Sequence, residues 1–113
     1  GITEVQAAQI REELKNKYGM FVYKGILSED YAIAPKSTWA DFVFSRNYNL
    51  KPLKEVESFI AENEHLPDVP SAAQVAEQGY SQHDMNKVLL QKIEELTLYI
   101  IKQQKEIEEL KRR

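Results

Sequence analysis

The sequence predicts a mainly helical α+β domain whose long C-terminal helix forms a parallel coiled coil. From Gln82 to Lys111 the chain contains no glycine and no proline, so about 30 residues can form one helix about 45 Å long. Apolar residues recur along this stretch with the alternating four- and three-residue spacing of a coiled-coil seam. The chain has only 113 residues, so its own core is modest and oligomerisation would enlarge it.

Residues 1–37 are expected to form an N-terminal helix and a small β element. Apolar residues spaced three and four apart predict a helix over Thr3–Tyr18, and Thr3 with Gln6 matches a capping box. Two stretches, Met20–Leu27 and Tyr31–Ala34, have the composition of strands and are separated by a polar turn. A small hairpin is the simplest interpretation.

Residues 38–81 are expected to connect the N-terminal part to the long C-terminal helix, the rod, and to pack against it. The aromatic run Thr38–Phe44 is either a third strand or an irregular packing segment. A helix is predicted from Pro52 to Asn63, because proline suits a first turn and apolar residues then line one face.

The two prolines in His65–Pro70 exclude a helix there and predict an extended connector. Ser71 with Gln74 matches a capping box that opens a short helix, and Gly79 is the residue expected just beyond its end. Ser81 is expected to cap the last helix.

Residues 82–113 form the predicted oligomerisation helix, whose seam residues are the candidate site. Position a of the heptad is taken by Asn86, Ile93, Ile100 and Ile107, and position d by Leu89, Leu96, Gln103 and Leu110. Six of these eight residues are Ile or Leu, so this stripe needs a cover, and a helix of the same kind is the simplest one.

The seam and its flanks also bear on register and strand number. Asn86 and Gln103 penalise shifted registers, in which they would face Ile or Leu; alternatively, Asn86 is simply the frayed first turn. Ile at a with Leu at d favours two strands. The apolar face is wider than a two-stranded seam requires, with Leu90 and Thr97 at e and Tyr99 at g, so we expect both own-chain packing and more than two helices.

Composition excludes several classes of function. With 15 Lys and Arg against 18 Asp and Glu, the chain lacks the basic footprint of a nucleic-acid-binding protein, and no apolar run is long enough for membrane insertion. There is no cysteine, and the two histidines, His65 and His83, lie 18 residues apart, so no metal or cofactor is expected. We expect no enzymatic activity.

Several motifs agree in order with one family. They are Trp39–Phe44, Tyr48–Leu50, Leu53–Glu57, His65–Pro67, Pro70–Ala72 and Ile93–Tyr99. Together they resemble the C-terminal end of Bacteroidetes tail-fibre-domain proteins, over about residues 38–113. That family is similar in placement to the intramolecular chaperone domains that end phage tail fibres and tail spikes. The segment before Thr38 departs from the repetitive fibre sequence usual there.

The resemblance implies a homotrimeric cap, on a virion tail fibre or at a cell surface, that aligns three chains before the fibre shaft forms. Two alternatives remain open. Trp39 among other aromatic residues suits a receptor-binding tip that recognises a cell-surface glycan or protein, although core packing explains it too. The second alternative is a self-cleaving chaperone, because some related chaperones cut their own chain with a serine and a lysine. Here Trp39-Ala40-Asp41 lacks that serine, and only Ser37 beside Lys36 lies close by.

Overall fold

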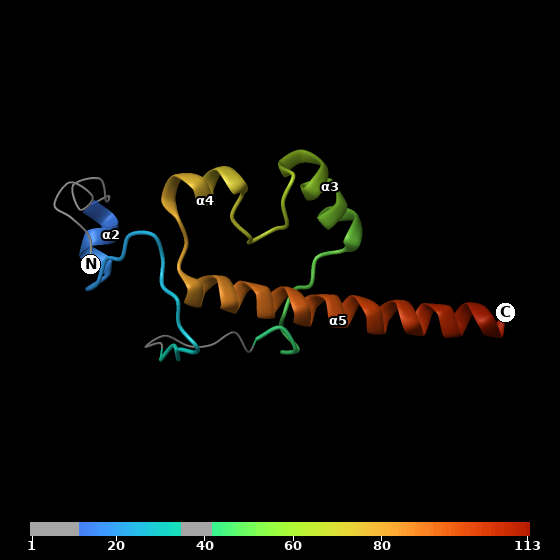
Figure 1. Ribbon diagram of the computed structural model, residues 1–113. Helices are drawn as coiled ribbons and strands as arrows, with labels where there is room; N and C mark the ends of the chain where they lie inside the picture. Colours follow the sequence, from blue (N-terminus) through green and yellow to red (C-terminus); the bar gives the residue numbers. More distant parts are fainter. Residues whose placement is uncertain (1–11, 35–41) are drawn as a thin grey trace. The chain divides into compact units, whose positions relative to one another are not determined.

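A 31-residue helix, α5 (Gln82–Arg112), is the longest element of the chain (Figure 1). The computed structural model describes residues 12–34 and 42–113. Within these ranges three shorter helices precede α5: α2 (Glu12–Lys17), α3 (Leu53–Asn63) and α4 (Ala72–Gln78). The chain is therefore mainly helical, as predicted, and it divides into one unit of residues 1–33 and a second of residues 34–113.

The first unit contains α2 and an irregular segment. α2 lies inside the predicted helix Thr3–Tyr18, whose residues up to Arg11 lie outside the described part of the chain. The backbone N–H of Tyr18 donates to the carbonyl of Leu14 at 3.1 Å and closes the last turn. The prediction of a helix here is confirmed for the residues that the structure describes.

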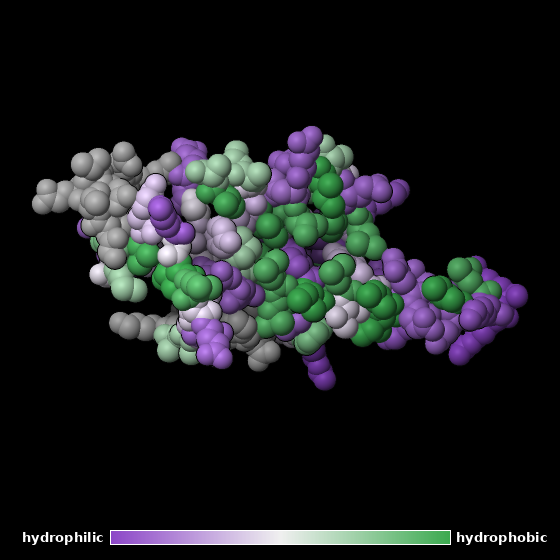
Figure 2. All heavy atoms as spheres, in the orientation of Figure 1, coloured by the Kyte–Doolittle hydropathy of each residue, from purple (hydrophilic) through white to green (hydrophobic). Residues whose placement is uncertain are grey.

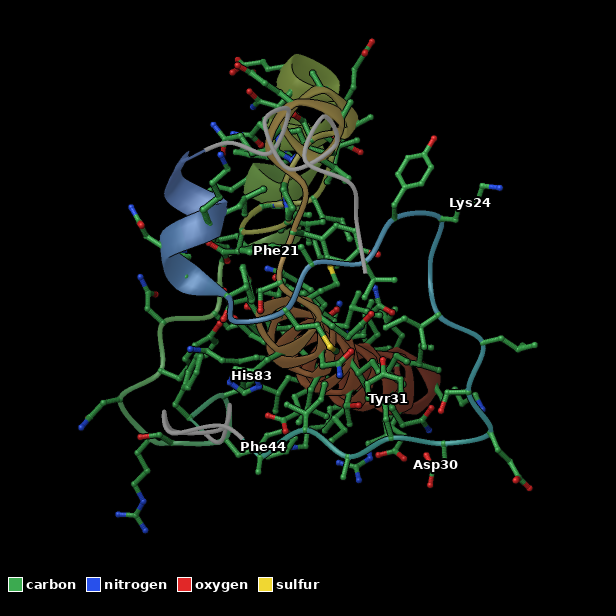
Figure 3. The ribbon with its side chains drawn as sticks, turned by 60° about the vertical axis from the view of Figure 1, so that its left-hand side comes forward. Phe21, Lys24, Asp30, Tyr31, Phe44 and His83 are labelled. Atoms are coloured by element: carbon green, nitrogen blue, oxygen red, sulfur yellow. The ribbon has the colours of Figure 1, made fainter. Side chains whose placement is uncertain are left out.

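The predicted β element over residues 20–34 is not confirmed, because the structure has no strand in this segment. Lys24 and Gly25 have φ values of 77° and 107°, which interrupt the extended backbone in the middle of the first predicted strand. Figure 3 shows the Lys24 side chain on the outer side of this bend, directed away from the segment. An isolated two-stranded hairpin is only marginally stable, so strand-like composition alone does not produce one.

Hydrogen bonds in the second half of this segment are local. The Ser28 hydroxyl donates to the Asp30 carbonyl at 2.7 Å, and the Tyr31 N–H donates to the Asp30 carboxylate at 2.8 Å. These bonds form a polar turn at the predicted place without pairing two strands.

The second unit begins, among the described residues, with two consecutive turns. The Ser45 N–H donates to the Phe42 carbonyl and the Tyr48 N–H to the Ser45 carbonyl, both at 3.1 Å. The ring centres of Phe42 and Tyr48 lie 5.8 Å apart. Val43, which follows Phe42 in the sequence, is 1% exposed. For residues 42–44 the irregular packing segment is therefore the correct alternative, and the third strand is not.

The helices α3, α4 and α5 begin where the sequence predicts. Pro52 immediately precedes α3. Ser71 forms the predicted capping box with Gln74, and the Ser81 hydroxyl accepts from the N–H of Asp84 at 3.2 Å. α4 ends at Gly79, whose φ of 66° favours glycine.

The connector between α3 and α4 is a tight turn, not the extended segment predicted. The Val69 N–H donates to the Leu66 carbonyl at 3.2 Å across Pro67 and Asp68. Proline at the second position and a positive φ, here 68° at Asp68, are typical of a type II turn. Proline thus excluded a helix, as expected, but it favoured a turn.

Burial is sparse throughout the described part of the chain. Val43 and Pro67 are its only buried residues, and α3, α4 and α5 contain none. Figure 2 shows hydrophobic side chains gathered over α3 and the first part of α5, whereas the far end of α5 is mainly hydrophilic. In residues 12–34 and 42–113, no helix is long and apolar enough to cross a membrane.

Candidate oligomerisation surface

The predicted seam residues lie along one face of α5, and their side chains remain largely open to solvent. The exposed fractions of the six apolar ones are 48% for Leu89, 58% for Ile93 and Leu96, 64% for Ile100, 46% for Ile107 and 62% for Leu110. Asn86 is half-buried and accepts a hydrogen bond from the Gln82 side chain at 2.8 Å, while Gln103 is exposed. We call this face the seam.

Other faces of α5 are occupied by the chain itself. The Tyr48 hydroxyl donates a hydrogen bond to the carboxylate of Glu95, which is at position c. It also accepts one from the side-chain amide of Gln91, at position f, over 3.2 Å. The Tyr99 hydroxyl, at position g, donates to the Lys51 carbonyl at 2.6 Å. The chain therefore packs on positions c, f and g and leaves the six apolar residues at positions a and d largely exposed.

These contacts refine the predicted packing of the connecting residues on the rod. They come from the segment before α3 and from the turn after it, whereas α3 itself stands beside α5 across a cleft. Tyr99, which the sequence assigned to a widened apolar face, is engaged by its own chain.

A charged cluster joins the turn after α3 to α5. The Lys92 ammonium lies 2.9 Å from the Glu95 carboxylate and 3.1 Å from that of Asp68. The side chains of Lys92 and Glu95 are only 13% and 14% exposed, whereas that of Asp68 is 57% exposed. The type II turn places Asp68 at this position, so the turn fixes one wall of the cleft.

Two pKa values in this cluster are raised. Burial lowers the pKa of the Lys92 ammonium, but hydrogen bonds to Glu95 and Asp68 and their negative charges outweigh burial, and the net pKa is higher than usual. Burial raises the pKa of the Tyr48 hydroxyl, and its hydrogen bond to Glu95 adds to this effect. At neutral pH the cluster therefore holds a charged lysine and a protonated tyrosine.

The cleft between α3 and α5 has a volume of about 280 Å³ and is mostly apolar. Leu53 and Val56 line it from α3, Leu66 and Pro67 from the turn, and Leu96 and Tyr99 from α5. Leu96 is also a position-d residue, so the cleft opens beside the seam. Sequence reasoning missed this cleft, because its α5 wall lies 24 or more residues beyond the other two walls and no local pattern links them.

Beyond the cleft, the last turns of α5 project without cover. Every residue from 100 to 113 is exposed. Among the described residues, the side-chain hydrogen bonds and ion pairs there are local: an ion pair of 3.6 Å between Glu109 and Arg113, and a hydrogen bond of 3.1 Å between Gln104 and Glu108. Such exposed pairs contribute little to stability.

Of the remaining sequence-based candidates, the structure describes only the two histidines. Trp39, Ser37, Lys36 and Asp41 lie outside the described residues. The His65 ring packs edge-on against Phe59 and lies 2.9 Å from the Leu66 carbonyl. Within the described ranges, no three His, Cys, Asp or Glu side chains are grouped so that they could hold a metal ion.

Comparison of the chain with protein-family models, with curated proteins and with solved structures gave no match.

Proposed function

We propose that this chain is a trimerisation and folding module that aligns three copies of a fibre protein, with a structural and not a catalytic role. One observation carries the proposal: six apolar residues line the seam of α5, each 46–64% exposed, while positions c, f and g are engaged by the chain itself. An apolar stripe on a long helix requires a cover.

The exposed end of α5 supports the same conclusion. From Ile100 onward every residue of this helix is exposed, and most helical stability in proteins comes from packing of an amphipathic face. Ile100, Ile107 and Leu110 continue the seam through these turns. Pairing with other copies of α5 would supply the missing burial along its whole length.

The width of the open face favours three strands. Beside the seam, Thr97 at position e and Ile101 at position b are also exposed, whereas Lys92 and Tyr99 at position g are engaged by the chain. Each helix of a trimer contacts one neighbour on each flank, so it uses a wider strip than a helix in a dimer. The alternative is a dimer, which Ile at a with Leu at d favours.

The fibre context rests on the resemblance to the C-terminal end of Bacteroidetes tail-fibre-domain proteins. A module that joins three chain ends makes all later pairing intramolecular, at a high effective concentration. Asn86 and Gln103 within the seam penalise shifted registers, so the three shafts would start in step. We place the module on a phage-like tail fibre or on a bacterial surface fibre.

A fusion tests the assembly function directly. The 113-residue chain is attached to the C-terminal end of a short collagen-like (Gly-Pro-Pro) repeat, which also requires three chains. Refolding after heating is followed by circular dichroism at several concentrations, and a fusion carrying Ile93→Asp and Ile100→Asp is the control. We expect a higher Tm and faster, less concentration-dependent refolding than for the repeat alone, with both gains lost in the control. Refolding no faster than that of the repeat alone would contradict the proposal.

A further inference from the structure

The cleft between α3 and α5 is an apolar space that its own chain does not fill. Its volume is about 280 Å³, and Leu53 and Leu66 on its walls are 45% and 44% exposed. The cleft is open to solvent, so its apolar walls lack the close packing found in protein interiors. α3 has no buried residue, so its apolar face is only partly covered in the single chain.

The position of the cleft beside the seam indicates what fills it. Leu96 lines the cleft and is also a position-d residue, and the position-g residues Lys92 and Tyr99 line it too. In a parallel coiled coil the g flank of one helix meets the e flank of the next. The cleft therefore lies where the e flank of a neighbouring α5 would pass.

The other flank of α5 carries the features needed to fill the cleft. Ile101, at position b, is 46% exposed although it lies outside the a and d positions. Thr97, at position e, is exposed one turn before it. We call Glu94, Thr97 and Ile101 the α5 edge.

Each of the two surfaces also includes at least one charged residue. One carboxylate oxygen of Glu94 is buried with no hydrogen-bond partner among the described residues. Lys51 lines the cleft, and its ammonium lies 5.8 Å from the Phe59 ring centre, with no carboxylate of the described residues within ion-pair distance. The α5 edge thus offers an exposed isoleucine, and the cleft offers apolar walls.

We infer that the cleft of each chain receives the α5 edge of the next copy in the assembly. This inference rests on the proposed trimerisation. It makes the contact heterologous, with the cleft of one chain against the edge of another, so three copies close a ring. It also gives α3 a role, because α3 would complete its packing only in the assembled protein.

Cross-linking tests the contact, and the absence of cysteine from the chain provides a clean background. Leu53→Cys in the cleft is combined with Ile101→Cys in the edge, and a short bis-maleimide joins thiols that lie close together. The matched control combines Leu53→Cys with Lys102→Cys. Residues 101 and 102 are both exposed but point about 100° apart around the helix.

The inference predicts a band of three covalently joined chains on a denaturing gel for the Leu53/Ile101 pair. The control pair should give mostly single chains, because residue 102 faces away from the neighbour's cleft. If light scattering shows a trimer but the two pairs cross-link equally, the inference is wrong and the trimerisation stands. If the unmodified chain is a monomer, both are wrong.

A second measurement needs no cross-linker. Ile101→Ala should raise the dissociation constant of the assembly by at least about tenfold, because it removes burial at each contact. Lys102→Ala should leave the dissociation constant within about threefold of the unchanged value. An equal effect of the two changes would overturn the inference.

Discussion

Placing aspartate at two positions of the seam should separate the chains. Ile93 and Ile100 occupy successive a positions and are 58% and 64% exposed in the single chain. Complete burial of such a side chain contributes about 1.5 to 3 kcal/mol, so burial of the exposed part contributes about 1 to 2 kcal/mol. The double change Ile93→Asp plus Ile100→Asp removes six such contributions from a trimer.

The loss amounts to roughly 6 to 11 kcal/mol for each trimer, before the cost of desolvating the aspartates is added. Since about 1.4 kcal/mol is a factor of ten, the association constant should fall by at least about four orders of magnitude. The variant should therefore be a monomer at micromolar concentration.

Light scattering on a sizing column measures this change as an absolute mass. The matched control is Lys105→Asp plus Arg112→Asp, because these exposed residues are also seven apart but lie at position f. The control should keep the mass of the unchanged protein, and circular dichroism should show helix in both variants. An oligomer of unchanged mass in the Ile93/Ile100 variant would refute the heptad assignment.

Three further predictions follow from contacts within the chain. Ser71→Ala removes the capping box of α4 and should lower the free energy of unfolding by about 1 kcal/mol in urea denaturation, whereas Ser58→Ala on exposed α3 should not lower it. The pKa values of Lys92 and Tyr48 are raised in the folded state, so their contribution to stability is complete below their ordinary values of 10.5 and 10.0 and is lost as pH rises through the folded values. Urea denaturation should therefore show a free energy of unfolding that falls above about pH 10.5, and the fall should be smaller for the Lys92→Met variant than for the unchanged protein. An equal fall in both proteins would contradict the role assigned to Lys92. Leu98→Asp, on the half-buried f position, should lower the Tm but leave the number of chains unchanged in light scattering.

Local signals in the sequence located the helix boundaries well. Pro52 and Ser71 act through the backbone of the residues next to them, so their effects can be read without knowledge of the fold. Gly79 ends α4 for an equally local reason, since its positive φ is costly for other residues. These three positions are where the structure confirms the sequence most directly.

Long-range packing could not be predicted in the same way. The Lys92–Glu95 pair is visible as a three-residue spacing, but the contact of Lys92 with Asp68 spans 24 residues and depends on the turn after Pro67. Tyr99 was counted as apolar surface, whereas its hydroxyl is bound to the Lys51 carbonyl, 48 residues away. The cleft formed by these contacts is invisible to any periodicity.

The predicted β element shows that strand-like composition is not enough to establish a strand. Met20 and Ile26 suit a strand, yet they are 73% and 70% exposed in an irregular segment. β-propensity chiefly reflects packing on a half-buried sheet, and the described residues of this unit provide no sheet to pack on.

The solution mass of the chain tests the central claim most directly. Light scattering on a sizing column, repeated over a tenfold range of concentration, needs no ligand and no variant. We predict a mass near three times 13.1 kDa that stays constant as the protein is diluted. A mass of 13.1 kDa at every concentration would mean that the seam has no partner chain, and it would contradict the proposed assembly role.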